Sequence, residues 1–178
     1  MEFKLLTQEE KEQYYQTMLC MMEISDQDFV PPLSQRSSTT QKTLTGTAST
    51  DVHAGLSSYL NTMMNQEILA CIEDGKLLGF VSFIKDYTTD YITEADLPNI
   101  YLSTLILNPE ARGRGITKQM YGHLFNDLYA DRHIFTRTWS TNVPHIKILG
   151  YYNFVELARI PNHRGEGIDT VYYAKRRD

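Results

Sequence analysis

The sequence predicts an α+β fold, in which helices cover the faces of a mixed β-sheet. Two observations support this. The apolar runs at 67–73 and 76–85 are separated by an Asp-Gly dipeptide, which is typical of a two-residue β-hairpin. Further along, an apolar run at 100–107 leads through a Gly-rich turn into a helical pattern and then into another apolar run at 133–139. A hairpin followed by strand, helix and strand indicates antiparallel and parallel pairs in one sheet.

The length and charge fit one domain that does not bind nucleic acid broadly. A chain of 178 residues buries enough surface to fold as a single domain, here 1–178, without disulfides. The formal net charge is −5, which argues against a general nucleic-acid partner. No apolar stretch is long enough to span a membrane, and no secretory signal opens the chain. We therefore expect a cytoplasmic protein with no membrane partner.

The first elements can be placed from local signals. Phe3 and Leu5 alternate with polar residues, which predicts a short strand. The segment from Thr7 to Glu10 matches a capping box, so a helix is expected from there to about Ser25. Its apolar stripe is interpreted as core contact.

A polar segment follows, at about 26–50. Two prolines end the helix, and residues 34–50 are almost all small and polar, with few groups to bury. The segment is therefore either a solvated surface loop or a lid over a site, since long loops in compact domains are often functional. Asp51 is then expected to cap a second helix.

The C-terminal half continues the alternation of helices and strands. After the Gly-rich turn, Ile116, Met120, Leu124 and Leu128 form one helical stripe. Pro144 fits the first turn of a short helix that runs to about Tyr151. Strands are expected at 154–160 and 168–174.

The cysteines and histidines give no sign of a metal centre. Cys20 and Cys71 lie in apolar stretches and are expected to be buried free thiols. The histidines are scattered, and none has a partner at metal-ligand spacing, so no metal site is predicted. His123 is interpreted as structural and His145 as solvated.

Residues 105–117, with the sequence LILNPEARGRGIT, form the most informative segment. A strand enters a Gly-rich turn that opens a helix, and the free N–H groups of a first helical turn favour a phosphate. Arg112 and Arg114 add positive charge. The alternative is a tight turn without a ligand. A dinucleotide fingerprint needs a third glycine, which this turn lacks, and the chain contains no G-x-x-x-x-G-K-[ST] motif of a P-loop.

This segment resembles the acetyl-CoA motif of the GNAT acetyltransferase superfamily. The matching strand positions are Leu105, Leu107 and Pro109, and the matching turn positions are Arg112, Gly113 and Gly115. Asn142 and the stretch at 148–154 also resemble family features. The resemblance covers nearly the whole chain and implies a mostly antiparallel central sheet with helices on both faces.

The resemblance assigns roles to these residues. The main chain of Leu105, Ile106 and Leu107 would hold the pantetheine arm of acetyl-CoA, and the Leu107 N–H would stabilise the oxyanion. The turn would cradle the pyrophosphate through its N–H groups, and Asn142 would contact the same molecule. The turn residues in this role are Arg112, Gly113, Arg114, Gly115, Ile116 and Thr117.

Two positions depart from the family motif, and the second of them leaves the catalytic acid unassigned. Thr117 replaces a small residue of the motif, and Leu149 occupies the position of the tyrosine that often protonates the leaving thiolate. Tyr151 is a candidate acid in its place, and solvent is the alternative. Tyr101 is a candidate for a water relay to the amine, with Ser103 or Thr104. Glu94 and Asp96 are further candidates for the base. Four tyrosines are expected to border the cleft: Tyr87, Tyr101, Tyr151 and Tyr152.

The resemblance implies an N-acetyltransferase that uses acetyl-CoA and a primary amine of a small molecule or peptide, by direct attack. Loop acids would suit a cationic acceptor; they are Asp26, Asp28, Asp86, Asp90, Glu94 and Asp96. The alternatives are a non-catalytic acyl-CoA-binding or sensor module and an interaction domain with a vestigial motif. The Gly-rich loop around Arg164 is interpreted as bordering either the pocket or the edge of a homodimer.

Overall fold

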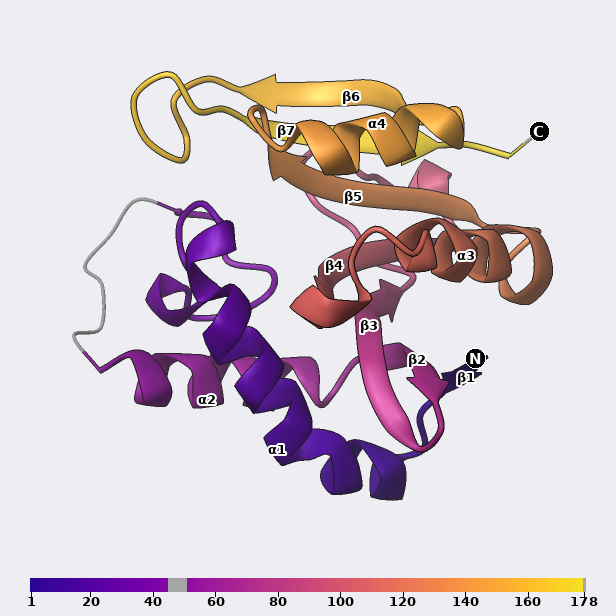
Figure 1. Ribbon diagram of the computed structural model, residues 1–178. Coiled ribbons are helices and arrows are strands. Elements are labelled where there is room, and N and C mark those ends of the chain that lie inside the picture. The colour runs from indigo at the N-terminus through magenta and orange to yellow at the C-terminus, as the bar shows by residue number, and fades with distance from the viewer. Residues whose placement is uncertain (45–50, 178) are drawn as a thin grey trace.

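The computed structural model describes residues 1–44 and 51–177. Its described strands form one seven-stranded sheet in the order β1-β2-β3-β4-β5-β7-β6 (Figure 1). The strands are β1 (Glu2–Leu5), β2 (Glu67–Glu73), β3 (Lys76–Lys85), β4 (Asn99–Leu107), β5 (His133–Trp139), β6 (Val155–Ile160) and β7 (Thr170–Lys175). Neighbours pair antiparallel except β4 and β5, so the expected mixed, mostly antiparallel sheet is confirmed.

Helices cover both faces of this sheet, as predicted. The helices α1 (Gln8–Ser25) and α2 (Val52–Met63) share one apolar cluster with residues of β2 and β3. The helices α3 (Ile116–Gly122) and α4 (Val143–Tyr151) share another cluster, which uses the alternate residues of the same strands. Successive side chains of a strand point to opposite faces, so the two clusters lie on opposite sides of the sheet.

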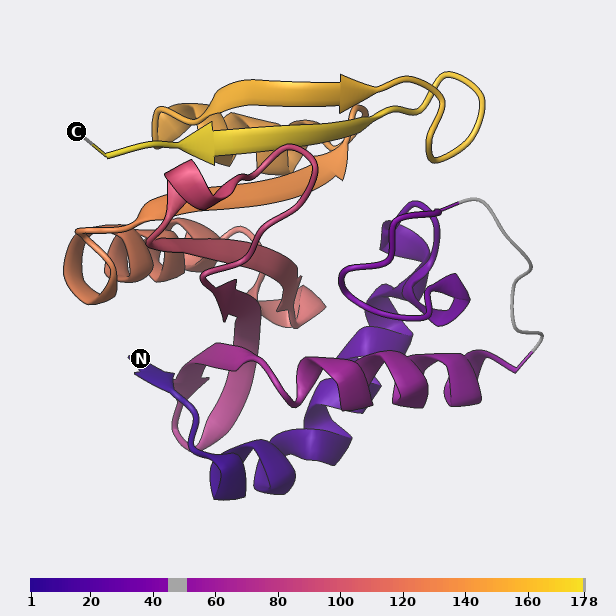
Figure 2. The ribbon, with the colours of Figure 1, turned by 180° about the vertical axis from the view of Figure 1, so that it is seen from behind.

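The parallel pair β4–β5 separates after a short stretch. It joins residues 99–102 of β4 to residues 133–136 of β5, while residues 103–107 continue in β4 without a β5 partner. On its other edge β4 stays paired with β3, with a register shift between Ser82 and Phe83 that marks a β-bulge. The segment between β3 and β4 passes over β5 and β7, where Ile92 packs against Phe135 and Tyr172 (Figure 2).

The local signals in the sequence locate their elements correctly. Asp74 and Gly75 both have positive φ, 49° and 74°, which is the backbone of a type I′ hairpin turn. The Thr7–Glu10 capping box is present, and the Asp51 side chain accepts from the Ala54 N–H. These contacts depend on neighbours in sequence, so sequence alone can predict them.

Two packing predictions are wrong. The helix after Ile116 continues as a π-helical turn, His123–Leu128, in which the Tyr129 N–H donates to the Leu124 carbonyl. Five-residue spacing rotates the helix surface, so Leu128 leaves the buried stripe and is exposed. Cys20 is also exposed, because the buried stripe of α1 runs through Met18, Met21 and Met22. No described helix is long and apolar enough to cross a membrane.

The described part of the polar segment, up to residue 44, is packed against the domain. Leu33, Ser34, Thr39 and Leu44 are buried. The Asp26 carboxylate accepts from the Ser34 N–H at 2.8 Å and from the Ser34 hydroxyl at 2.9 Å. The expectation that this stretch has little to bury is therefore wrong for residues 34–44, while 45–50 lie outside the described residues.

Gly55 of α2 sets how closely this segment packs. A Cβ at this position would lie 2.2 Å from the Ser34 carbonyl oxygen, which is backbone and has little room to move. We expect Gly55→Ala to lower the melting temperature by about 2–10 °C, since overpacking costs about 1–3 kcal/mol. Gly150→Ala in α4 is the matched control, because a Cβ there meets nothing within 4 Å. Thermal unfolding followed by circular dichroism measures both, and equal melting temperatures would contradict the close contact.

Candidate active site

A cavity of about 500 Å³ opens where β4 and β5 diverge. Its walls come from the unpaired end of β4, from β5, from the starts of α3 and α4, and from the segment that follows α1. Residues from both ends of the chain therefore meet at the point where the parallel pair splits (Figure 1).

The free edge of β4 presents main-chain groups to the cavity. Leu105, Ile106 and Leu107 line it while pairing with β3 on their other edge. The Asn108 N–H donates to the Leu78 carbonyl of β3 at 2.8 Å. Because N–H groups alternate in direction along a strand, the N–H groups of Leu107 and Leu105 point away from β3, toward the cavity.

The Gly-rich turn leads from this edge into α3. Gly113 and Gly115 have φ of 76° and 71°, a left-handed backbone that favours glycine. The Gln119 N–H donates to the Gly115 carbonyl at 3.1 Å, and the N–H groups before it have no helical acceptor. Thr117 lines the cavity, whereas Ile116 is buried in the core below it.

The two arginines of the turn are tied to carboxylates. Arg112 lines the cavity and pairs with Asp28 at 2.7 Å. Arg114 donates to both oxygens of Glu73, at 2.9 and 2.8 Å. Much of the positive charge that the sequence places at the turn is therefore neutralised by the chain itself.

Asn142 lies on the opposite wall, as the N-cap of α4. Its Nδ2 donates to the Thr138 hydroxyl at 3.0 Å, and its Oδ1 accepts from the His145 N–H at 3.4 Å. Asn142 and Thr138 both line the cavity. The structure thus brings Asn142, the β4 edge and Thr117 around one space.

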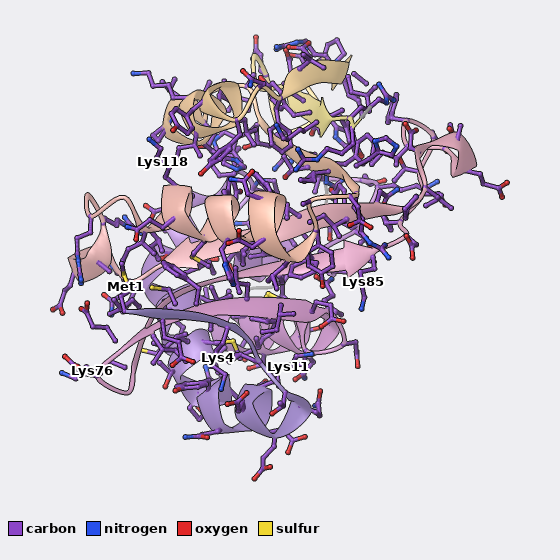
Figure 3. All side chains as sticks on the ribbon, turned by 90° about the vertical axis from the view of Figure 1, so that its right-hand side faces the viewer. Met1, Lys4, Lys11, Lys76, Lys85 and Lys118 are labelled. Atoms are coloured by element: carbon purple, nitrogen blue, oxygen red, sulfur yellow. The ribbon has the colours of Figure 1, made fainter. Side chains whose placement is uncertain are left out.

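The structure does not bring Tyr151 or Tyr101 into the cavity wall. Tyr151 is 61% exposed, and the Lys118 ammonium lies 3.6 Å from its ring centroid, between α3 and α4 (Figure 3). Tyr101 is 2% exposed and packs against Tyr87, with ring centroids 4.6 Å apart. Burial raises the pKa of Tyr101 far above its usual value, so its hydroxyl keeps its proton.

Tyr121, which helical spacing assigns to packing alone, is the tyrosine found in the described cavity wall. Its hydroxyl lies 2.8 Å from Nε2 of His145, another lining residue. Burial raises the pKa of Tyr121 and lowers that of His145 to about 4. The pair is therefore neutral near pH 7, and the expectation of a solvated His145 is wrong.

Five of the six loop acids have a partner among the described residues. Asp86 pairs with Arg132, Asp90 with Lys42, and Asp96 with Arg176. Asp26 holds Ser34, as described above. Asp96 and Glu94 do not line the cavity, whereas Ser103 and Thr104 do. These pairings neutralise part of the negative charge on which the expectation of a cationic acceptor rests.

Two lining arginines were missed from the sequence, Arg36 and Arg137, while Arg164 lies in the Gly-rich loop that was expected to border either the pocket or a dimer edge. One signal could have found Arg137, because it shares one face of its strand with the aromatic residues Phe135 and Trp139. Arg36 lies in the polar segment, where no local pattern in the sequence indicates a side chain that points inward. Among the described residues, no cluster of three His, Cys, Asp or Glu side chains is arranged to hold a metal ion.

The comparisons with known proteins agree with this geometry. The model of the acetyltransferase (GNAT) family matches residues 38–154. None of the curated proteins matches the chain in sequence.

Solved structures show the same fold at low identity. An N-acetyltransferase from Staphylococcus aureus Mu50 has a TM-score of 0.64 and 16% identity, covering 98% of this chain and 96% of that one. The yncA protein from Salmonella typhimurium, solved with its cofactor acetyl-CoA, has a TM-score of 0.63 and 13% identity. The match covers 100% of this chain and 94% of that one. Aminoglycoside 6'-acetyltransferase type Ii has a TM-score of 0.67 and 15% identity, and the match covers 98% of this chain and 96% of that one.

Proposed function

This chain belongs to the GNAT acetyltransferase family, and we propose that it transfers the acetyl group of acetyl-CoA to a primary amine by direct attack. The observation that carries the proposal is the cavity-facing edge of β4, which leads directly into the Gly-rich turn of α3. The β4 edge offers a row of main-chain groups, and the turn that opens α3 offers free N–H groups at the start of a helix. We take 1–178 as one domain for this function; a homodimer and a cytoplasmic location stay predictions.

The residues present fit acetyl-CoA. A Cβ added at Gly113 would meet nothing within 4 Å, and one at Gly115 would meet only the end of the Gln119 side chain, so the turn faces open space. Main-chain N–H groups in such a turn bind phosphates. We infer that Gly113 to Thr117 hold the pyrophosphate, with Arg112 and Arg114 nearby, and that Leu105 to Leu107 pair with the pantetheine arm. Asn142 would contact it from the other wall.

Acetyl-CoA supplies an activated acetyl group, and the chain would supply its orientation. The amine nitrogen bonds to the acetyl carbon, the bond from that carbon to sulfur breaks, the amine loses a proton to water and the thiolate takes one up. The Leu107 N–H would donate to the acetyl oxygen as its negative charge grows. Ser103 and Thr104 line the cavity and are candidates to bind the water that accepts the amine proton.

Two measurements test the proposal. Calorimetry with acetyl-CoA should show binding, and no binding at millimolar concentration would contradict the assignment. Thiol release over a panel of amines should then show turnover. Tight acetyl-CoA binding without turnover for any amine would instead support the non-catalytic acyl-CoA-binding module, which the absence of a family tyrosine at Leu149 favours.

Tyr121 is our preferred donor to the leaving sulfur, because it lines the cavity and its hydroxyl keeps its proton. We expect Tyr121→Phe to lower kcat by about 10-fold, the value of one hydrogen bond of about 1.4 kcal/mol, with little change in acetyl-CoA affinity. Tyr151→Phe is the matched comparison, and steady-state kinetics decides between them. A loss of kcat in Tyr151→Phe alone would return the role to Tyr151.

A further inference from the structure

Three guanidinium groups from distant parts of the chain line one region of the cavity. Arg36 belongs to the segment after α1, Arg137 to β5, and Arg164 to the loop between β6 and β7. Aromatic rings hold two of them: the Arg36 guanidinium lies 5.4 Å from the Phe29 ring centroid and that of Arg164 lies 5.7 Å from the Trp139 ring centroid. These ring contacts help to fix the positions of Arg36 and Arg164.

None of the three has a carboxylate partner among the described residues. The ion pairs found there use other arginines, namely Arg112, Arg114, Arg132, Arg159 and Arg176. A buried charge without a counter-ion is costly, and like charges in one cavity add to that cost. The arrangement is explained most simply by an anion that enters from outside.

The hydrogen bonds of these arginines satisfy only part of their donors. Arg137 donates to the Gln41 carbonyl at 2.8 Å, and Arg164 donates to the Thr170 hydroxyl at 2.9 Å and to the Val30 carbonyl at 2.6 Å. Arg36 donates through Nε to the Pro31 carbonyl at 3.0 Å. Among the described residues, Nη2 of Arg36 is buried and has no hydrogen-bond partner. The same holds for one other described side-chain atom, Nε of Arg177.

The three charges act on one another. Burial, followed by the positive charges of Arg36 and Arg137, lowers the pKa of Arg164 to about 9. Burial is also the main cause that lowers the pKa of Arg36, with Arg137 contributing. All three are expected to carry their charge near pH 7, because an arginine guanidinium stays protonated in proteins.

The arginines lie across the sheet from the Gly-rich turn. On β5, Ile134 belongs to the cluster under α3, and Thr138 bonds Asn142 of α4. Side chains alternate along a strand, so Arg137 points to the opposite face. The proposed pyrophosphate site and the arginines thus lie on different sides of the split between β4 and β5, which separates the arginines from the phosphates of acetyl-CoA.

We propose that Arg36, Arg137 and Arg164 bind an oxyanion of the acceptor, so that the substrate carries a carboxylate or a phosphate in addition to its amine. The inference rests on the proposed transferase function and specifies its substrate class. Guanidinium groups match these oxyanions in geometry and charge, and Arg36 Nη2 is a buried donor that has no hydrogen-bond acceptor among the described residues.

Paired probes test this proposal. Glycine, β-alanine and 4-aminobutyrate are each compared with the corresponding amide, and 2-aminoethyl phosphate with 2-aminoethanol. Calorimetric binding is measured with saturating coenzyme A, which has no acetyl group to transfer, and kcat/KM for thiol release is measured at saturating acetyl-CoA, so the binding comparison does not depend on turnover. We expect at least one anionic probe to exceed its neutral partner by about 10- to 100-fold, and the carboxylate and phosphate series show which oxyanion fits.

The two proposals fail differently. Neutral amines that bind and react as well as their anionic partners would overturn the oxyanion site and leave the transferase intact. Anionic probes that bind selectively without turnover would support the oxyanion site and contradict the transferase. If the anionic probes are not preferred in binding or in turnover, the oxyanion site is overturned, whether or not the protein is a transferase.

Variants locate the effect. Arg36→Met should reduce kcat/KM for the preferred anionic amine by about 10- to 100-fold, with its neutral partner changed by less than about twofold. Arg36→Lys, which keeps the charge, should recover part of the loss, and Arg159→Met on the exposed strand β6 removes one charge as a control. Equal losses for both partners, or a loss of acetyl-CoA affinity in Arg36→Met, would overturn the assignment.

Discussion

Gly115→Asp is expected to weaken acetyl-CoA binding by about 100-fold, because it places a carboxylate at the proposed pyrophosphate site. Two unit charges about 4 Å apart repel by roughly 1 kcal/mol in water and about 4 kcal/mol near a protein surface. The pyrophosphate carries more than one negative charge, so the repulsion adds to the loss of space. Calorimetric titration with acetyl-CoA measures the change in Kd.

Gly115→Asn is the matched control for this experiment. Gly115 has a φ of 71°, so any side chain there is strained, but asparagine tolerates this conformation and has the size of aspartate without its charge. We expect Gly115→Asn to lose much less affinity. Equal losses for the two variants would show that backbone strain, not an anion at this turn, decides the affinity.

Leu107→Pro is expected to lower kcat by about 100- to 1000-fold, which is the usual effect of removing one oxyanion donor. Proline removes the Leu107 N–H, which points to the cavity and not to β3, so the pairing of β3 and β4 should survive. Residue 106 is already in a strand, which is the conformation that a following proline favours. Pre-steady-state and steady-state thiol release give kcat.

Leu107→Ala separates the N–H from the side chain. The Leu107 side chain packs against Gly79, so both variants lose this contact and some stability. Only Leu107→Pro loses the donor, so a large kcat loss in that variant and a small one in Leu107→Ala is expected. Similar kcat values for two folded variants would remove Leu107 from the reaction.

Local signals predicted most of the fold. The strands at 67–73, 76–85 and 133–139 match the structure at both ends, because each is bounded by turn residues in the sequence. The π-helical turn after α3 was not foreseen, since a helical stripe is drawn with a constant period. One inserted residue was enough to move Leu128 to the surface.

The side chains around the reacting groups were harder to predict. The tyrosine that acts as the acid in the family aligns with Leu149, so the nearby Tyr151 was the candidate acid. In the structure, α4 directs Leu149 into the core and Tyr151 outward. Tyr121 has the same helical spacing as a core residue and is indeed buried, yet it also borders the cavity. A residue can be buried in the core and also border the cavity only where its helix lies at the edge of a cleft. The spacing of residues in the sequence cannot identify that edge.

The sequence by itself determined the order of the elements, the Gly-rich turn and the family resemblance, because each depends on residues close together along the chain. Only the tertiary structure decided which charges remain available in the cavity. It paired Asp86 and Asp96 with arginines and Asp90 with a lysine, and it brought Arg36, Arg137 and Arg164 together with no carboxylate partner among the described residues. Charge balance within a cavity depends on side chains that meet only after folding, so neither net charge nor local composition predicts its sign.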